Sequence, residues 1–283
     1  MANLFMRFPG WKTKAFTMSY DDGVRQDAHL MDIMNRRGLK GTFNISSGLF
    51  APEDPKNLDS RIFGRRMTQR EALELYGNSE HEVAVHGLTH SFLEHLPSNR
   101  AAYEIVEDRR RLENLFGYTV RGMAYPFGAF NDETVQILQK AGILYARTVD
   151  CTEKFDIPQD WLRLMPTCHH GHPQLMDLCD EFIGRKVIHA PQLFYLWGHS
   201  YEFDDDGNWS VIERFAEKIS DRQDIWYATN ISVFDYITAY RQLRFSVDMS
   251  MVENPTHTDL YFSGSDKNYM VKSGKTLFMG DLI

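Results

Sequence analysis

Strand-like and helix-like segments alternate along the chain. Short apolar runs, typical of buried strands, are followed by segments whose apolar residues recur every three or four positions, which predicts helices. The expected strands are 14–20, 41–45, 81–86, 120–125, 143–149, 193–197 and 226–228. The expected helices are 24–37, 68–76, 99–116, 132–140, 174–182, 211–219 and 233–241.

This repeated order predicts a fold class. Consecutive βα units indicate a parallel sheet covered by helices. Their number, without a GxGxxG motif, favours a closed (β/α) barrel over an open dinucleotide-binding sheet. We therefore expect a single α/β barrel domain over residues 1–241. Local signals also set two helix ends, with Thr68 or its neighbour as an N-cap and Gly117 as a C-terminal stop.

The pattern changes after Arg241. Short alternating segments at 245–251, 259–262, 269–271 and 276–279 are separated by Asn-Pro and glycine turns. Residues 242–283 are therefore expected to form a small C-terminal β appendage packed on the barrel. The sequence leaves open whether this appendage covers one end of the barrel or mediates self-association into a homo-oligomer.

Composition narrows the class of partner. The chain has 283 residues, a formal net charge of -8 and a pI of about 5.8, without a run rich in Lys or Arg. Nucleic acid and anionic membranes are thus not expected as partners. The three cysteines form no CxxC pair, and neither a secretory signal nor a membrane-spanning apolar run is visible. A cytoplasmic protein is the expectation.

Two motifs carry candidate chemistry. Asp21 and Asp22 follow the first long strand, and His86 and His90 follow a later one at an i, i+4 spacing. One carboxylate and two imidazoles are a common ligand set for a divalent metal, and the second carboxylate is then free to act as a base. Each motif has a plainer explanation when taken alone, since Asp-Asp-Gly also suits a turn. Together they favour a hydrolase.

These motifs resemble those of the polysaccharide deacetylases, the NodB homology domain of carbohydrate esterase family 4. The family's Asp-Asp-Gly motif matches residues 19–23, and its His-Ser/Thr-x-x-His motif matches residues 86–90. Its Arg-Pro-Pro-Tyr-Gly motif aligns with residues 124–128, and its apolar strand ending in His-Asp aligns with residues 196–200. The resemblance covers roughly residues 14–240 and implies an irregular (β/α) barrel.

The resemblance also implies roles for individual residues. Asp21 is the expected base, His199 the expected acid, and the backbone N–H of Phe127 the expected donor to the oxyanion. The implied metal ligands are Asp22, His86 and His90. Zn²⁺ is the ion that best suits these ligands, although Ni²⁺, Co²⁺ or Fe²⁺ would also fit. The expected activity is metal-dependent removal of an acetyl group from an N-acetylated sugar or related amide.

The chain departs from the family pattern in several places. Gly87 stands where a hydroxyl residue is usual, and Ser200 replaces an aspartate. The arginine that orients the base falls on Ala124; Arg147 is the candidate replacement, with a surface ion pair as its alternative. The carboxylate that tunes the acid histidine is not evident, and its candidates are Asp150, Asp156 and Asp160.

Residues for substrate binding are harder to choose. The third motif contributes Tyr125 and Pro126, and Trp161 and Trp226 could stack on a sugar ring or simply belong to the core. His169 and His170 lie in a three-histidine loop that could face substrate, form a hydrogen-bonded corner or bind a second metal. The acidic run 202–206 is expected to be a solvated loop.

Two other functions compete with sugar deacetylation. A hydrolase of a non-sugar C–N bond, such as a cyclic amide or ureide, is kept open by the departure at Ala124. A barrel that binds carbohydrate without turnover is the second, but a pure binder has no need of both a base and an acid. In each case the expected partner is a small-molecule or oligosaccharide ligand.

Overall fold

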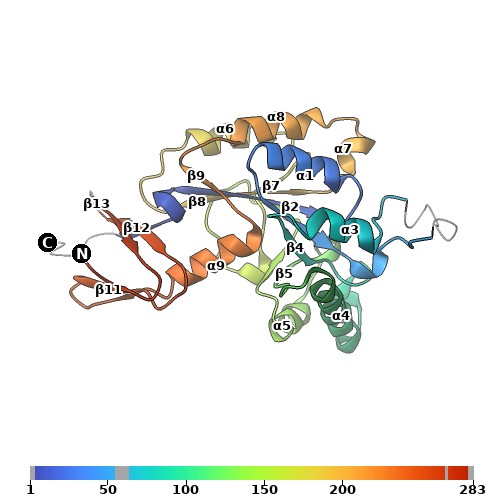
Figure 1. Ribbon diagram of the computed structural model, residues 1–283, viewed down its shortest axis with the longest axis horizontal. Coiled ribbons are helices and arrows are strands. Elements are labelled where there is room, and N and C mark those ends of the chain that lie inside the picture. Colours follow the sequence, from blue (N-terminus) through green and yellow to red (C-terminus); the bar gives the residue numbers. More distant parts are fainter. Residues whose placement is uncertain (1–3, 55–63, 265–266, 280–283) are drawn as a thin grey trace.

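The computed structural model describes residues 4–54, 64–264 and 267–279. A curled sheet of parallel strands lies at its centre, in the order β6-β5-β4-β3-β2-β8-β7, with β9 pairing the first half of β2 (Figure 1). These strands are β2 (Lys14–Asp21), β3 (Gly41–Ile45), β4 (Glu82–Val85), β5 (Gly122–Ala124), β6 (Tyr145–Arg147), β7 (Cys168–His169), β8 (Gln192–Gly198) and β9 (Ile225–Tyr227).

A short irregular segment joins the two outer strands of this sheet. Leu164 forms a parallel bridge with Arg147 of β6, and its N–H donates to the carbonyl of Ala146. Three residues later the N–H of Thr167 donates to Tyr195 of β8, and β7 then pairs with β8. The sheet thus curls round on itself. The expected irregular (β/α) barrel is confirmed.

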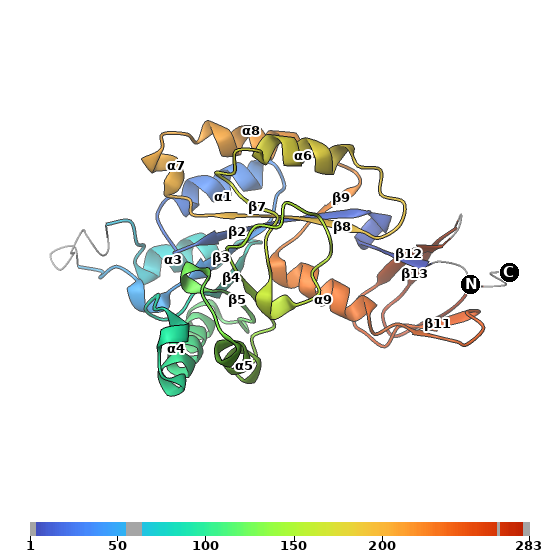
Figure 2. The same ribbon diagram turned by 180° about the vertical axis from the view of Figure 1, so that it is seen from behind.

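Helices cover the sheet on two sides. Figures 1 and 2 show α1, α6 and α8 along one side, and α4 and α5 on the other. The α-helices are α1 (Asp27–Arg36), α3 (Gln69–Tyr76), α4 (Ser98–Phe116), α5 (Asp132–Lys140), α6 (Leu175–Gly184), α7 (Glu202–Asp205), α8 (Ser210–Ile219) and α9 (Asn230–Tyr240). Short 3-10 turns are η1 (Pro9–Trp11), η2 (Ser47–Leu49), η4 (Leu93–His95), η5 (Pro126–Gly128) and η6 (Trp161–Arg163).

The two helix ends expected from local signals are both present. The Thr68 side chain accepts from the N–H of Glu71, and the Glu71 carboxylate accepts from the N–H of Thr68, which is a complete capping box. Gly117 ends α4 at φ 78°, a left-handed conformation that glycine adopts without a steric penalty. Among the described residues, no helix is long and apolar enough to cross a membrane.

The strands of the C-terminal segment form two small antiparallel sheets, and the N-terminal strand β1 joins one of them. The strand orders are β1-β12-β13 and β10-β11-β14. Their strands are β1 (Leu4–Arg7), β10 (Arg244–Phe245), β11 (Met251–Glu253), β12 (Leu260–Gly264), β13 (Lys267–Val271) and β14 (Thr276–Phe278). The single strand expected at 245–251 is wrong. A turn separates β10 from β11, because the Asp248 carboxylate accepts from Ser246 Oγ and from the N–H of Ser250.

Strand β1 was not expected from the sequence. It pairs with β12 along its whole length, so that Leu4 lies opposite Gly264. The division of the chain into two domains at residue 241 stays a prediction. Strand β1 comes from the N-terminal part of the chain but belongs to a sheet of the appendage. A hydrophobic cluster joins the appendage to the barrel, with Phe8, Tyr195, Tyr236 and Leu260 among its buried members.

Tyr236 provides a test of this junction. Its hydroxyl donates to the carbonyl of Arg7 at 2.6 Å and accepts from the N–H of Tyr261 at 3.0 Å. Tyr236→Phe leaves both backbone groups without this partner and is expected to lower the free energy of unfolding by about 1–2 kcal/mol. Chemical denaturation measures the loss. Tyr103→Phe on the exposed face of α4 is the matched control; an equal loss in both variants would contradict the assignment.

Candidate active site

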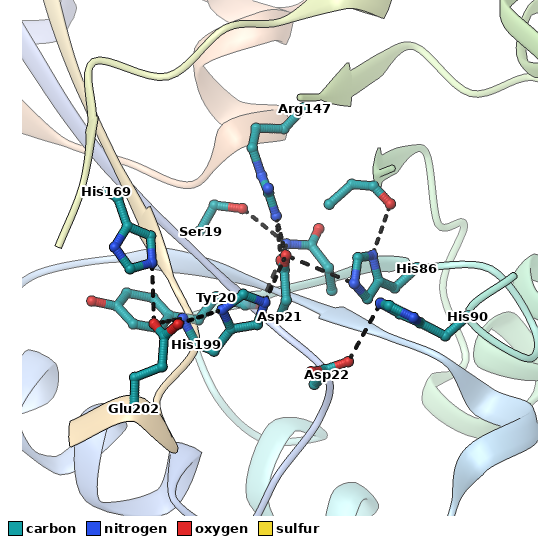
Figure 3. Close-up of polar contacts among 12 residues, drawn as sticks. Ser19, Tyr20, Asp21, Asp22, His86, His90, Arg147, His169, His199 and Glu202 are labelled. Carbon is teal, nitrogen blue, oxygen red and sulfur yellow. Dashed lines mark hydrogen bonds and ion pairs between the residues drawn. The ribbon is translucent and has the colours of Figure 1, made fainter. Parts of the chain in front are cut away.

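The candidate residues gather where the parallel strands end. Asp21 is the last residue of β2 and Arg147 the last of β6, while His86 and His199 follow directly after β4 and β8. Figure 3 shows these side chains converging on Asp21. Strands of a parallel barrel have their carboxyl ends at one face, so residues distant in sequence meet there.

Asp21 is held as a buried carboxylate. Arg147 is fully buried and donates to both oxygens of Asp21, which excludes the surface ion pair considered for it. Asn44 adds a hydrogen bond of 2.8 Å. Burial alone opposes ionisation of Asp21, but the charge of Arg147 and its hydrogen bonds hold the pKa of Asp21 below the ordinary value. Asp21 is therefore ionised at neutral pH.

The geometry around His86 suits a metal ligand. His86 Nδ1 lies 2.8 Å from the carbonyl oxygen of Ala124, an acceptor, so this nitrogen carries the ring proton. The opposite nitrogen, Nε2, then has a free lone pair; it is buried and has no hydrogen-bond partner among the described residues. Asp22, His86 and His90 offer ligand atoms that all lie within 4.8 Å of one another. These residues fit a divalent metal ion.

Both imidazoles are in the protonation state that binding requires. Burial lowers the pKa of His86, and burial lowers that of His90 to about 4. A neutral ring offers a lone pair at neutral pH, whereas an imidazolium cannot act as a ligand.

Three residues of the site have left-handed backbone conformations. Asp22 has φ 87°, His90 φ 54° and Phe127 φ 58°, and none of them is glycine. Such conformations cost about 1–3 kcal/mol each and concentrate at functional sites. Gly87, where the family has a hydroxyl residue, lies at φ 74°, and a Cβ added there would lie 3.2 Å from Pro126 Cγ. Glycine relieves both constraints at this position.

Arg66 is a member of the site that the sequence did not indicate. It comes from the segment before α3, and its Nη2 lies 2.9 Å from Asp22 Oδ1, while its Nη1 donates to the carbonyl of Asp22. Burial works against ionisation of Asp22, but the charge of Arg66 keeps its pKa below the ordinary value. The guanidinium thus fixes the position and the charge of an expected metal ligand.

Glu202 is the second residue that was missed. It is the first residue of α7, so the expectation of a solvated loop at 202–206 is wrong. Its carboxylate lies 3.3 Å from His199 Nδ1 and accepts from the backbone N–H of His199 at 3.2 Å. Asp150, Asp156 and Asp160, the carboxylates expected to tune His199, are exposed, and Asp160 pairs with Arg163 instead.

The contacts of Glu202 favour a protonated His199. Burial lowers the pKa of His199, but the hydrogen bond to Glu202 and the charges of Asp21 and Glu202 outweigh it, so the pKa is raised. His199 Nε2 lies 3.9 Å from Asp21 Oδ2, so the imidazole lies between Glu202 and Asp21. The imidazole can hold a proton beside the expected base.

Glu202 also lies 3.1 Å from the Nε2 atoms of both His169 and His170, a grouping that resembles a second metal site. The Gly171 N–H, however, donates to His169 Nδ1 at 3.0 Å. His169 Nε2 must then carry the ring proton and donates it to Glu202, so it offers no lone pair to a metal. The histidine loop is better described as a hydrogen-bonded corner.

The other residues expected to bind substrate are less well placed. Tyr125, Pro126 and His170 are buried beneath the site, and His169 is partly exposed at its edge. Trp161 is buried against Phe234. Trp226 lies opposite Ala15 near the start of β2, at the other end of the barrel. The structure does not bring these two tryptophans to the site.

Exposed aromatic rings beside the metal ligands were missed. Phe92 and Phe127 stack face to face with ring centroids 3.8 Å apart, and the edge of His90 meets Phe127 at 4.4 Å. Phe92 and Phe127 are 43% and 51% exposed, which is unusual for phenylalanine and gives the site an apolar wall.

Comparisons with solved structures show which proteins share this fold. A structure from Mycobacterium smegmatis named as a polysaccharide deacetylase is 15% identical, with a TM-score of 0.55 over 83% of this chain and 93% of its own. The Xyl-CE4 domain of a multidomain xylanase from the hindgut metagenome of Trinervitermes trinervoides is 14% identical, with a TM-score of 0.50 over 81% and 92%. These two likenesses show that the fold is shared.

A third similar structure is the Streptococcus pyogenes deacetylase PplD in complex with acetate. It is 19% identical, with a TM-score of 0.43 over 52% of this chain. The chain spans 62% of that deacetylase's length. None of the curated proteins matches the chain.

The remaining comparison concerns the sequence itself. The family model described as polysaccharide deacetylase matches residues 11–146. This span contains both carboxylates, Asp21 and Asp22, and both histidines of the expected metal site, His86 and His90. Residues 11–146, just under half of the chain, thus match the polysaccharide deacetylase family model, and the chain shares the fold of the Mycobacterium smegmatis structure.

Proposed function

We propose that the protein is a metal-dependent deacetylase that hydrolyses the amide bond of an N-acetylated sugar. One observation carries this proposal. The ionised Asp21 has its Oδ2 3.7 Å from His86 Nε2, in the expected metal site, and 3.9 Å from His199 Nε2. A base therefore lies between a metal-ligand set and a proton donor, which is the arrangement that hydrolysis of an amide requires.

The ion would be held by Asp22, His86 and His90, and Zn²⁺ suits their nitrogen and oxygen donors best. When bound, it would supply Lewis acidity to the acetyl carbonyl and to the attacking water. Asp22 is ionised and both histidines are neutral, so the ligand set carries one negative charge.

The chain's own residues account for the proton transfers. Asp21 takes one proton from water as the C–O bond forms, and Arg147 keeps its carboxylate oriented for that step. The backbone N–H of Phe127 is the proposed donor to the oxyanion. His199 gives a proton to the nitrogen as the C–N bond breaks, because an amine leaves poorly without it. Acetate and a free amine are the products.

Two features bear on the substrate. The wall formed by Phe92 and Phe127 offers apolar contact to one face of a sugar ring, and His169 offers a polar edge. Cys151, Cys168 and Cys179 are all unpaired, which favours a reducing compartment. We therefore propose a cytoplasmic enzyme that acts on a soluble saccharide or glycoconjugate precursor.

The rival function, hydrolysis of a cyclic amide or ureide, rested on the missing arginine at Ala124. Because the guanidinium of Arg147 reaches Asp21 from the next strand, this departure no longer favours the rival. A panel of acetamido sugars and cyclic ureides, assayed for released acetate and for ring opening, tests the choice. Ring opening without acetate release would overturn the proposal.

Metal content is the most direct test of the ligand set. Wild-type protein is expected to contain about one divalent ion per chain, and Asp22→Ala and His86→Ala are expected to lose it, because three protein ligands are the minimum for tight binding. Elemental analysis of purified protein measures this. His95→Ala is the control, since His95 is largely exposed and outside the triad. Metal retained in the triad variants would contradict the assignment.

The pH dependence of acetate release tests the acid. His199 must be protonated, so activity should fall as pH rises through its pKa, which Glu202 raises above the ordinary value. Glu202→Gln removes this charge and should move the alkaline limb of the pH profile to lower pH. His199→Ala removes the acid itself and should lower the rate of acetate release by about 10²–10⁴-fold. Glu213→Gln, on the exposed face of α8, is the matched control. An unmoved limb in Glu202→Gln would argue against His199 as the acid.

A further inference from the structure

One buried carboxylate takes no part in the chemistry above. Asp27, the first residue of α1, is fully buried and lies below the two loops that carry the site. Its Oδ1 accepts from Ser200 Oγ at 2.5 Å. Its Oδ2 accepts from the Tyr76 hydroxyl at 2.6 Å and from the N–H of Val24 at 3.1 Å. Each oxygen of Asp27 thus accepts at least one hydrogen bond.

These contacts join parts of the chain that are distant in sequence. Val24 lies two residues after Asp22, in the loop between β2 and α1, and Ser200 directly follows His199, in the loop between β8 and α7. Tyr76 is the last residue of α3 and lies outside both of these loops. Asp27 therefore links the loop of the base and metal ligand to the loop of the acid.

Helix α7, which follows the acid loop, also makes surface contacts with the loop between β2 and α1 and with the segment before α3. Gln26 donates to Asp204 at 2.8 Å, and Arg65 makes two hydrogen bonds to Asp205. These contacts are exposed, where a pair contributes little because water competes for both partners. The link through Asp27 is buried, so losing a partner would leave a polar group unsatisfied in the interior, which costs more. The buried link is the one that can fix the distance between the loops.

We propose that Asp27 is a positioning residue that holds His199 in register with Asp21 through its hydrogen bond to Ser200. This inference rests on the proposed deacetylase function. It also gives a reason for the departure at residue 200, where the family has an aspartate. Here residue 200 contributes a hydroxyl to the acid loop, and the carboxyl group that it contacts comes from α1.

Two variants separate positioning from general stability. Ser200→Ala and Tyr76→Phe each delete one hydroxyl that donates to Asp27, but only Ser200 belongs to the acid loop. Each variant is assayed on an acetamido sugar and on 4-nitrophenyl acetate. The amide needs a proton on its leaving nitrogen, whereas 4-nitrophenolate leaves unprotonated. A displacement of His199 therefore slows hydrolysis of the acetamido sugar more than hydrolysis of 4-nitrophenyl acetate.

We expect Ser200→Ala to lower kcat for the amide by about tenfold or more and to leave ester hydrolysis within about twofold. KM and the affinity for zinc should not change. Tyr76→Phe should keep the wild-type ratio of amide to ester activity, even if its melting temperature falls. Equal losses on both substrates in Ser200→Ala, or the same change of ratio in Tyr76→Phe, would overturn the proposal.

Hydrogen–deuterium exchange provides a readout that does not depend on turnover. Uptake at the backbone amides of residues 199–202 should increase in Ser200→Ala and stay near wild type in Tyr76→Phe. If the wild-type protein hydrolyses neither substrate, the proposed function fails while this measurement still tests the link. Unchanged exchange in Ser200→Ala would show that Asp27 does not hold the acid loop.

Discussion

The buried ion pair between Asp21 and Arg147 is the interaction on which the site depends. Both side chains are almost completely removed from water, so neither charge is stable there without the other. Removing one partner of such a pair typically costs about 3–5 kcal/mol, because the remaining charge stays buried. The pair also joins β2 to β6, which lie four strands apart in the sheet. The same pair therefore connects two distant strands and keeps the base ionised.

Sequence patterns located the parts of the site that lie at strand ends. Apolar runs fix where a strand stops, so Asp21, His86 and Arg147 could be assigned to one face before any contact was known. Arg66 and Glu202 could not be found this way. Arg66 lies in a polar segment without periodicity, and Glu202 lies in an acidic run whose composition is that of a solvated surface. Both act through tertiary contacts, which local patterns do not encode.

The wrong expectation that Trp161 and Trp226 bind substrate has a different cause. A pattern shows that Trp226 belongs to a strand but not how far along the sheet that strand is set. β9 pairs only with the first half of β2, and this offset carries Trp226 to the far end of the barrel. The offset is a property of the pairing between β9 and β2, so it was not predictable from the β9 segment alone. The same reasoning applies to β1, whose partner is at the opposite end of the sequence.

The pairing of β1 with β12 has a consequence for biosynthesis. Leu4 lies opposite Gly264, so β1 has no partner during synthesis until translation has passed β12. Closing so large a loop costs conformational entropy, so β1 pairs with β12 only after the intervening barrel has brought the two segments close together. Until then β1 has an unpaired edge, the kind of segment on which nascent chains aggregate and molecular chaperones act. Translation of β12 thus marks the earliest moment at which the exposed edge of β1 can be covered by its native partner.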